Sequence, residues 1–189
     1  MIGWIIAGSI IGAIVIILII SVIVMYNNLV ERSVRVDNAW SQIDVQMKQR
    51  YDLIPNLVET VKAYASHEKS TLEEVTKWRA AAMEAKTPEE LMQSNQKLSG
   101  AIANIFATAE NYPDLKADAN FRQLSDELAG TENRISTARI DYNNKAKEFN
   151  SRIAKFPTNI IAGMFGFEKF SYFEASDADK ETPTVDFGQ

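Results

Sequence analysis

The pattern of apolar and charged positions divides the chain near residue 30. From Ile2 to Tyr26 the residues are almost all Ile, Val, Ala, Gly and Leu, and the first charged side chain is Glu31. A helix needs about 20 apolar residues to cross the hydrocarbon of a bilayer. Trp4 and Tyr26 stand at the two ends of the run, where aromatic rings favour the membrane interface. We therefore expect residues 1–30 to form a transmembrane anchor.

A cleaved signal peptide is the alternative interpretation of this run. Signal peptides begin with basic residues, carry a shorter apolar stretch and end at a small-x-small cleavage site. The run has no Lys or Arg before it, it is longer than such stretches, and no such site follows it. The sequence thus favours a retained, single-pass anchor.

Basic residues flank the run on one side only. Arg32 and Arg35 follow it closely, and none precedes it. Because positive residues are enriched on the cytoplasmic side, we expect the N-terminus outside and the domain in the cytoplasm.

Two glycines lie four residues apart within the anchor. The spacing of Gly8 and Gly12 allows two membrane helices to approach closely, although glycine is also common in membrane helices that do not pair. Both residues are candidates for self-association.

Beyond the anchor, apolar residues recur in steps of three and four, which is typical of helices with one buried stripe. A first helix is expected from about Leu29 to Ser66, with a kink at Pro55. Its stripe comprises Val36, Trp40, Ile43, Met47, Tyr51, Ile54, Val58, Val61 and Ala65.

Three further helices are expected. The second begins at a capping box formed by Ser70 and Glu73 and runs to about Ala85. The third begins at Thr87, with Pro88 in its first turn and Glu90 completing a second capping box, and is ended by Pro113. The fourth carries the stripe Phe121, Leu124, Leu128, Thr131, Ile135, Ala138, Tyr142, Ala146, Phe149, Ile153 and Phe156, and ends at Pro157.

These lengths predict an all-α fold: residues 31–157 form an antiparallel bundle of long helices with coiled-coil-like packing. Alternating directions bring Pro157 back toward the membrane. The next segment, 158–175, is aromatic, and is interpreted either as a membrane-proximal contact between subunits or as packing against the chain's own first helix near Val34–Trp40. Its candidate self-association residues are Phe165, Phe167, Phe170 and Phe173. The acidic tail, 176–189, is expected to be disordered.

Composition narrows the chemistry. The chain has no Cys, one His and a net charge of −5, and no block of it is strongly basic, so nucleic acid is not an expected partner. His67 has no partners at ligand spacing, and without a His base no catalytic triad is possible. We expect no catalytic residue, no metal and no cofactor.

Several motifs together resemble one family. They are D-L-I-P-N-L-V at 52–58, Tyr142-Asn143, Phe149-Asn150, and N-I-I-A at 159–162 followed by F-G-F at 165–167 and Y-F-E at 172–174. Over essentially the whole chain the sequence is similar to the LemA family. The resemblance implies a bacterial membrane protein with an N-terminal anchor and a helical bundle, without established enzymatic activity. It also implies likeness to a magnetosome-membrane protein, and a membrane metalloprotease as a partner.

The functional hypothesis is a non-catalytic, homo-oligomeric scaffold in contact with membrane lipid, with a role in membrane organisation or remodelling. The alternative is an adaptor that presents the bundle to a membrane protease or another membrane protein. An enzyme with an unrecognised site is the weakest of the three hypotheses.

Overall fold

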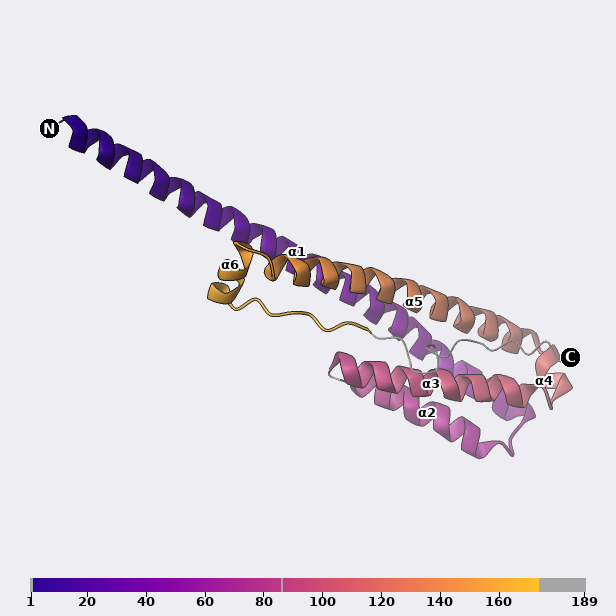
Figure 1. Cartoon of the computed structure of the whole chain (residues 1–189). Helices are drawn as coiled ribbons and strands as arrows, with labels where there is room; N and C mark the ends of the chain where they lie inside the picture. Colours follow the sequence, from indigo (N-terminus) through magenta and orange to yellow (C-terminus); the bar gives the residue numbers. More distant parts are fainter. Residues whose placement is uncertain (1, 86, 174–189) are drawn as a thin grey trace, which may run out of the picture. The chain divides into compact units, whose positions relative to one another are not determined.

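The computed structural model describes residues 2–85 and 87–173, apart from the side chains of residues 2–7 and 88. Within these ranges the secondary structure is helical, without a strand, as predicted (Figure 1). The helices are α1 (Ile2–Tyr64), α2 (Lys69–Glu84), α3 (Pro88–Ala109), α4 (Pro113–Ala117), α5 (Ala119–Ile153) and α6 (Thr158–Phe165). The acidic tail lies outside the described residues.

The chain forms two compact units, to which α1 and α5 both contribute. The anchor unit comprises residues 1–42 and 140–172. The bundle unit comprises residues 43–139 together with Phe173.

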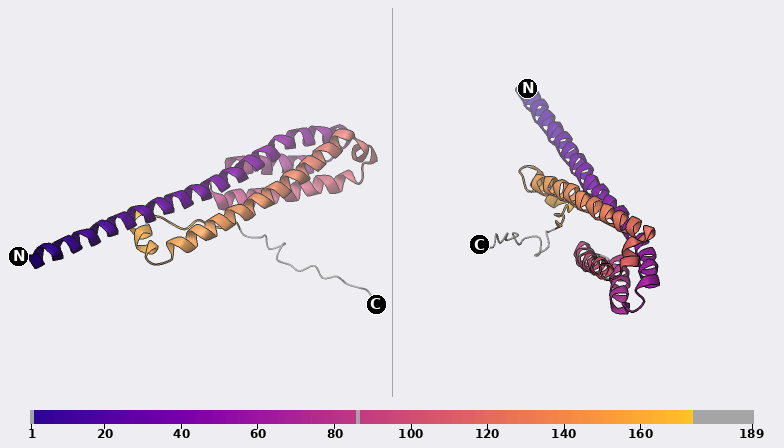
Figure 2. Two further views of the ribbon diagram at one scale, coloured as in Figure 1. Left: turned by 90° about the horizontal axis from the view of Figure 1, so that it is seen from above. Right: turned by 90° about the vertical axis from the view of Figure 1, so that its right-hand side faces the viewer.

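In the bundle unit, the chain reverses direction from α1 to α2, from α2 to α3 and from α3 to α5, and α2 lies beside α3 (Figure 2). This is the expected antiparallel arrangement of long helices. Its core is apolar and almost wholly shielded from solvent, with fully buried side chains from four helices: Ile43, Met47, Ile54, Leu57, Val61, Val75, Leu98, Ile105 and Ile135. Amphipathic helices are stabilised mainly by burying such stripes against one another.

The predicted stripe of the first helix is correct at most positions. Seven of its nine residues are buried, whereas Trp40 and Val58 are half-buried and Leu57 is buried instead of Val58. The helix continues through Pro55 to Tyr64. The kink at Pro55 stays a prediction.

Helix starts were predicted with mixed success. At α3 the capping box is confirmed: the Glu90 N–H donates to Thr87 Oγ1 at 3.1 Å, and the Thr87 N–H donates to Glu90 Oε2 at 3.3 Å. The capping box at Ser70 is wrong, because α2 begins at Lys69 with Glu68 before it. Ser70 therefore lies inside the first turn, where its hydroxyl cannot take the capping position.

Pro113 does not end the third helix as predicted. Helix α3 already ends at Ala109, and Pro113 instead starts the short helix α4, where its missing N–H is not needed. Helix α5 then begins at Ala119, two residues before Phe121, the first residue of the predicted stripe. The Asp118 carboxylate accepts the Phe121 N–H at 2.9 Å, and this bond holds the pKa of Asp118 below its usual value.

Helix α5 ends at Ile153, four residues before the predicted boundary at Pro157. The assignment of Phe156 to its buried stripe is wrong, since that side chain is 80% exposed. The helix ends before the stripe can continue, and the chain turns instead into α6.

Candidate functional site

Aromatic rings in the anchor unit join the end of the apolar run to the end of α5. The ring of Tyr26, on α1, lies 4.7 Å from that of Phe165 and 5.9 Å from that of Phe167, measured between centroids. The buried ring of Phe149, on α5, lies 6.1 Å from Phe167 and 5.1 Å from Phe170. Tilted and edge-to-face pairs at these distances are the favoured aromatic arrangements. We call these five residues the aromatic cluster.

Hydrogen bonds from side chains of α5 hold the segment after α6 against that helix. The buried amide of Asn150 accepts the Phe170 N–H at 2.9 Å, and it donates to the Phe170 carbonyl at 2.9 Å and to the Tyr172 hydroxyl at 3.0 Å. The Tyr142 hydroxyl donates to the carbonyl of Ser171 at 3.0 Å. Because an extended segment has no helical partners of its own, these bonds pair backbone groups of Phe170 and Ser171 with side chains of α5.

The two glycines of the anchor lie on an open helix surface. A methyl group added at Gly8 or Gly12 would meet no other atom within 4 Å, leaving aside the helix's own backbone. The structure therefore leaves this face open for contact, and its role in self-association stays a prediction.

The four candidate phenylalanines differ in exposure. Phe165 is 50% exposed, Phe167 and Phe170 are half-buried in the aromatic cluster, and Phe173 is 8% exposed. Phe173 belongs to the bundle unit, where the guanidinium of Arg139 lies 5.5 Å from its ring centroid. Only Phe165 thus offers a large surface for a contact outside the chain. Self-association through these rings remains a prediction.

Sequence reasoning missed two parts of this site. It did not predict α6 as a helix, or that Ile160 and Met164 on it would be exposed by 52% and 70%. A signal was present in Gly166, which follows the helix with a φ of 72° and ends it in the left-handed conformation that glycine favours. It also gave Asn150 no role, although the residue stands in one of the family-like motifs.

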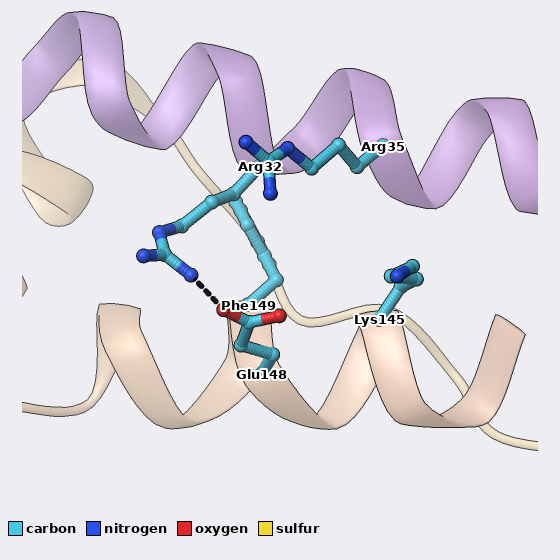
Figure 3. Close-up of a pocket in the computed structure, with 5 residues that line it drawn as sticks. All are labelled: Arg32, Arg35, Lys145, Glu148 and Phe149. Carbon is cyan, nitrogen blue, oxygen red and sulfur yellow. Dashed lines mark hydrogen bonds and ion pairs between the residues drawn. The ribbon is translucent and has the colours of Figure 1, made fainter. Parts of the chain in front are cut away.

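A charged groove between α1 and α5 links the two helices (Figure 3). Arg32 forms an ion pair with Glu148, and Figure 3 shows its guanidinium pointing across to that carboxylate. Arg35, which also lines the groove, pairs with Glu31 on its own helix at 2.6 Å. Their hydrogen bond raises the pKa of Arg35 and lowers that of Glu31. Arg32 and Arg35 are thus both paired with glutamates, so the groove connects α1 to α5 at the surface and is not a ligand site.

The bundle unit contains a polar network that was not predicted from the sequence. Arg50 is 4% exposed, its Nη1 lies 2.6 Å from Glu132 Oε2, and its Nη2 donates to Ser99 Oγ at 3.1 Å. The buried hydroxyl of the adjacent Tyr51 and the amide of Asn95, one turn before Ser99 on α3, are hydrogen-bonded at 2.8–3.0 Å. Burial lowers the pKa of Arg50 and raises that of Tyr51, because it disfavours the charged form of each. Arg50 Nη2 and the Tyr51–Asn95 pair have hydrogen-bond partners, whereas Arg50 Nε has none among the described residues.

The described part of the chain contains no cluster of three or more His, Cys, Asp or Glu residues suited to a metal ion. It contains one helix that is long and apolar enough to cross a membrane, and the apolar window of that helix is not buried in the structure.

The fold and site define a helical-bundle protein with an exposed N-terminal apolar helix and an aromatic segment folded back against it. Residues 39–187 match the model of the LemA family, so this chain belongs to that family. The match begins beyond the apolar run and covers both the bundle and the aromatic segment.

Individual relatives agree with this assignment. The chain is 29% identical over 158 residues to Protein LemA of Metamycoplasma hominis, covering 82% of this chain and 71% of the relative. It is 27% identical over an alignment of 193 residues to the magnetosome protein MamQ 2 of Paramagnetospirillum magneticum, covering 88% and 71%. With the magnetosome protein MamQ of Magnetospirillum gryphiswaldense the identity is 25% over 171 residues, covering 77% and 62%.

Proposed function

We propose that this chain is a non-catalytic scaffold that is anchored in the inner membrane of a bacterium and assembles with copies of itself. One observation carries the proposal. Every residue from Gly8 to Ile20 is exposed, although all but Ser9 are apolar. Burying one large aliphatic side chain is worth about 1.5–3 kcal/mol. Such a surface is not stable in water, and lipid or another copy is the cover that its length suits.

The self-assembly part rests on two surfaces of the anchor unit. Gly8 and Gly12 present a flat helix face on which a second helix can lie closely. Phe165, beside the end of the apolar run, offers a half-exposed ring. A role in membrane organisation or remodelling is the part of the proposal that the likeness to magnetosome proteins supports.

The mass of the full-length protein tests self-assembly. In mild detergent and in lipid nanodiscs we expect particles of several copies, and the double variant Gly8→Ile with Gly12→Ile should shift them to single chains. The matched control, Ile10→Ala with Ile14→Ala, alters the opposite helix face and should keep the wild-type mass.

A wild type that is a single chain in both media would overturn self-assembly and leave the adaptor role as the better function. Assemblies that survive the glycine substitutions would show that the contact lies outside this face of the anchor.

Orientation is a second expectation of the proposal. The N-terminal side of the apolar run carries no Lys or Arg, whereas Arg32 and Arg35 follow it, which places the bundle in the cytoplasm. Protease added outside intact spheroplasts should leave the bundle whole, and should digest it after lysis. Digestion before lysis would reverse the orientation.

A further inference from the structure

Helix α6 carries apolar residues on both of its faces, and its exposed polar residue is Asn159. Thr158, Ile161 and Ala162 form its inner face and are buried. On the outer face, Ile160 and Met164 lie one turn apart and are 52% and 70% exposed. Exposed large apolar side chains that lie together on a surface mark a site of contact with a partner or a membrane. The inner face is covered by the chain itself, and the outer face is not.

The position of α6 indicates what covers its outer face. Phe165, the last residue of the helix, places its ring 4.7 Å from that of Tyr26, where the apolar run of α1 ends. After Gly166 the chain turns back, and the N–H of Phe167 donates to the Ala162 carbonyl at 2.9 Å. Helix α6 therefore lies at the level where α1 passes from hydrocarbon to the headgroups. Tyr26 is itself the kind of residue found at that level.

Charge gives a second indication. Arg152 and Lys155 are exposed beside the exposed Phe156, and within the described residues neither forms an ion pair. The described part of the anchor unit carries seven basic and five acidic side chains, whereas the whole chain has a net charge of −5. Basic residues next to exposed aromatic and aliphatic ones are typical of surfaces that bind anionic bilayers.

We propose that the outer face of α6, together with Phe156, is a second membrane contact. It lies in the boundary between headgroups and acyl chains of the leaflet from which the bundle emerges, and it favours anionic phospholipid through Arg152 and Lys155. This contact, with the Tyr26–Phe165 ring pair, fixes how the anchor unit leaves the bilayer. The proposal rests on the membrane anchor of the proposed function and is independent of self-assembly.

Site-directed spin labels on the full-length chain test the proposal directly, since the sequence has no Cys to remove. Three single variants are needed: Met164→Cys on α6, Val15→Cys in the apolar run and Ile140→Cys on α5. Ile140 is a matched control, because it is 60% exposed and lies in the same unit. It is 13 residues before the end of α5 at Ile153, which along a helix is about 20 Å.

The labels are compared in nanodiscs of mixed phosphatidylcholine and phosphatidylglycerol by their relaxation with oxygen and with a water-soluble nickel complex. At position 164 we expect a lipid environment about 5–10 Å below the headgroups. Position 15 should lie deeper, and position 140 should be in water. Arg152→Gln with Lys155→Gln should move label 164 toward water in these nanodiscs, but not in discs of phosphatidylcholine alone.

The outcomes separate the two proposals. A label in water at 164, with 15 in lipid, overturns the second membrane contact and leaves the anchor intact. A label in water at 15 overturns the anchor itself. A label at 164 shielded from both reagents means that protein covers α6, which also overturns the contact. An unchanged depth after the charge substitutions overturns the preference for anionic lipid.

Discussion

Replacing Phe149 by Ala should lower the free energy of unfolding by about 3–5 kcal/mol, the range for removing a large aromatic side chain from a core. Phe149 is 1% exposed, and its ring contacts those of Phe167 and Phe170. The substitution removes the side chain on which the segment after α6 rests. Its loss should both destabilise the anchor unit and open residues 167–172 to proteolysis.

An exposed phenylalanine just after α5 provides a matched control for Phe149→Ala. Phe156 is the same residue type seven positions later and is 80% exposed. In detergent, Phe156→Ala should change stability by less than about 0.5 kcal/mol. Denaturant unfolding followed by circular dichroism compares the two variants, and limited proteolysis reports the freed segment. Equal stabilities would show that the aromatic cluster does not hold the segment in place.

The spacing of apolar residues predicted the helices well, because burial of one apolar face is also what stabilises them. The stripe from Ile43 to Val61 is buried since one face of α1 must be covered by other helices. Helix ends were less predictable. Ser70 and Thr87 both precede a glutamate by three residues, yet only Thr87 caps a helix, because the true start of α2 falls two residues earlier than the motif implies.

Some features of the candidate site could not be predicted from the spacing of apolar residues. The aromatic segment was recognised from its composition, and the meeting of Phe165 with Tyr26 agrees with helix lengths that return the chain toward the apolar run. The exposure of Met164 could not be foreseen, since in a helix of eight residues the covered face is chosen by its neighbours. A stripe of apolar residues cannot reveal that choice when both faces are apolar.

The buried arginine is the clearest position that sequence patterns missed. Arg50 stands next to Tyr51 in the motif-rich stretch of α1, and an arginine on a helix is ordinarily solvated. Here the guanidinium is enclosed by the bundle, and a carboxylate 82 residues later in the chain neutralises it. Pairings over such sequence distances depend on the tertiary arrangement of the helices, which a single sequence does not encode in its local pattern.

Removing the Glu132 carboxylate is the second change that we expect to lower the free energy of unfolding strongly. Glu132→Ala removes the ion-pair partner of Arg50, whose side chain is 4% exposed in the wild type, and leaves the Ser99 hydroxyl as its hydrogen-bond partner. An uncompensated buried charge costs about 3–5 kcal/mol. Because the Glu132 side chain is itself 44% exposed and water can partly replace it, we expect the lower end, about 3 kcal/mol.

A nearby glutamate provides the control for this prediction. Glu127 is exposed on the same helix and accepts a hydrogen bond from the exposed Gln123 at 2.9 Å, so Glu127→Ala should change stability by less than about 0.5 kcal/mol. Denaturant unfolding of the full-length protein measures both variants. Equal losses would mean that Glu132 acts only as a surface residue.

A double variant separates the cost of an unpaired charge from the loss of a favourable pair. If burial of Arg50 is what makes Glu132 necessary, then Arg50→Met with Glu132→Leu should recover the wild-type stability or exceed it, since apolar replacements of buried ion pairs are often neutral or stabilising by about 1–4 kcal/mol. Glu132 also attracts the charge of Arg139, which remains in the double variant without this carboxylate. Should the double variant remain as unstable as Glu132→Ala, the carboxylate is needed for Arg139 as well, and the pair with Arg50 alone does not explain the network.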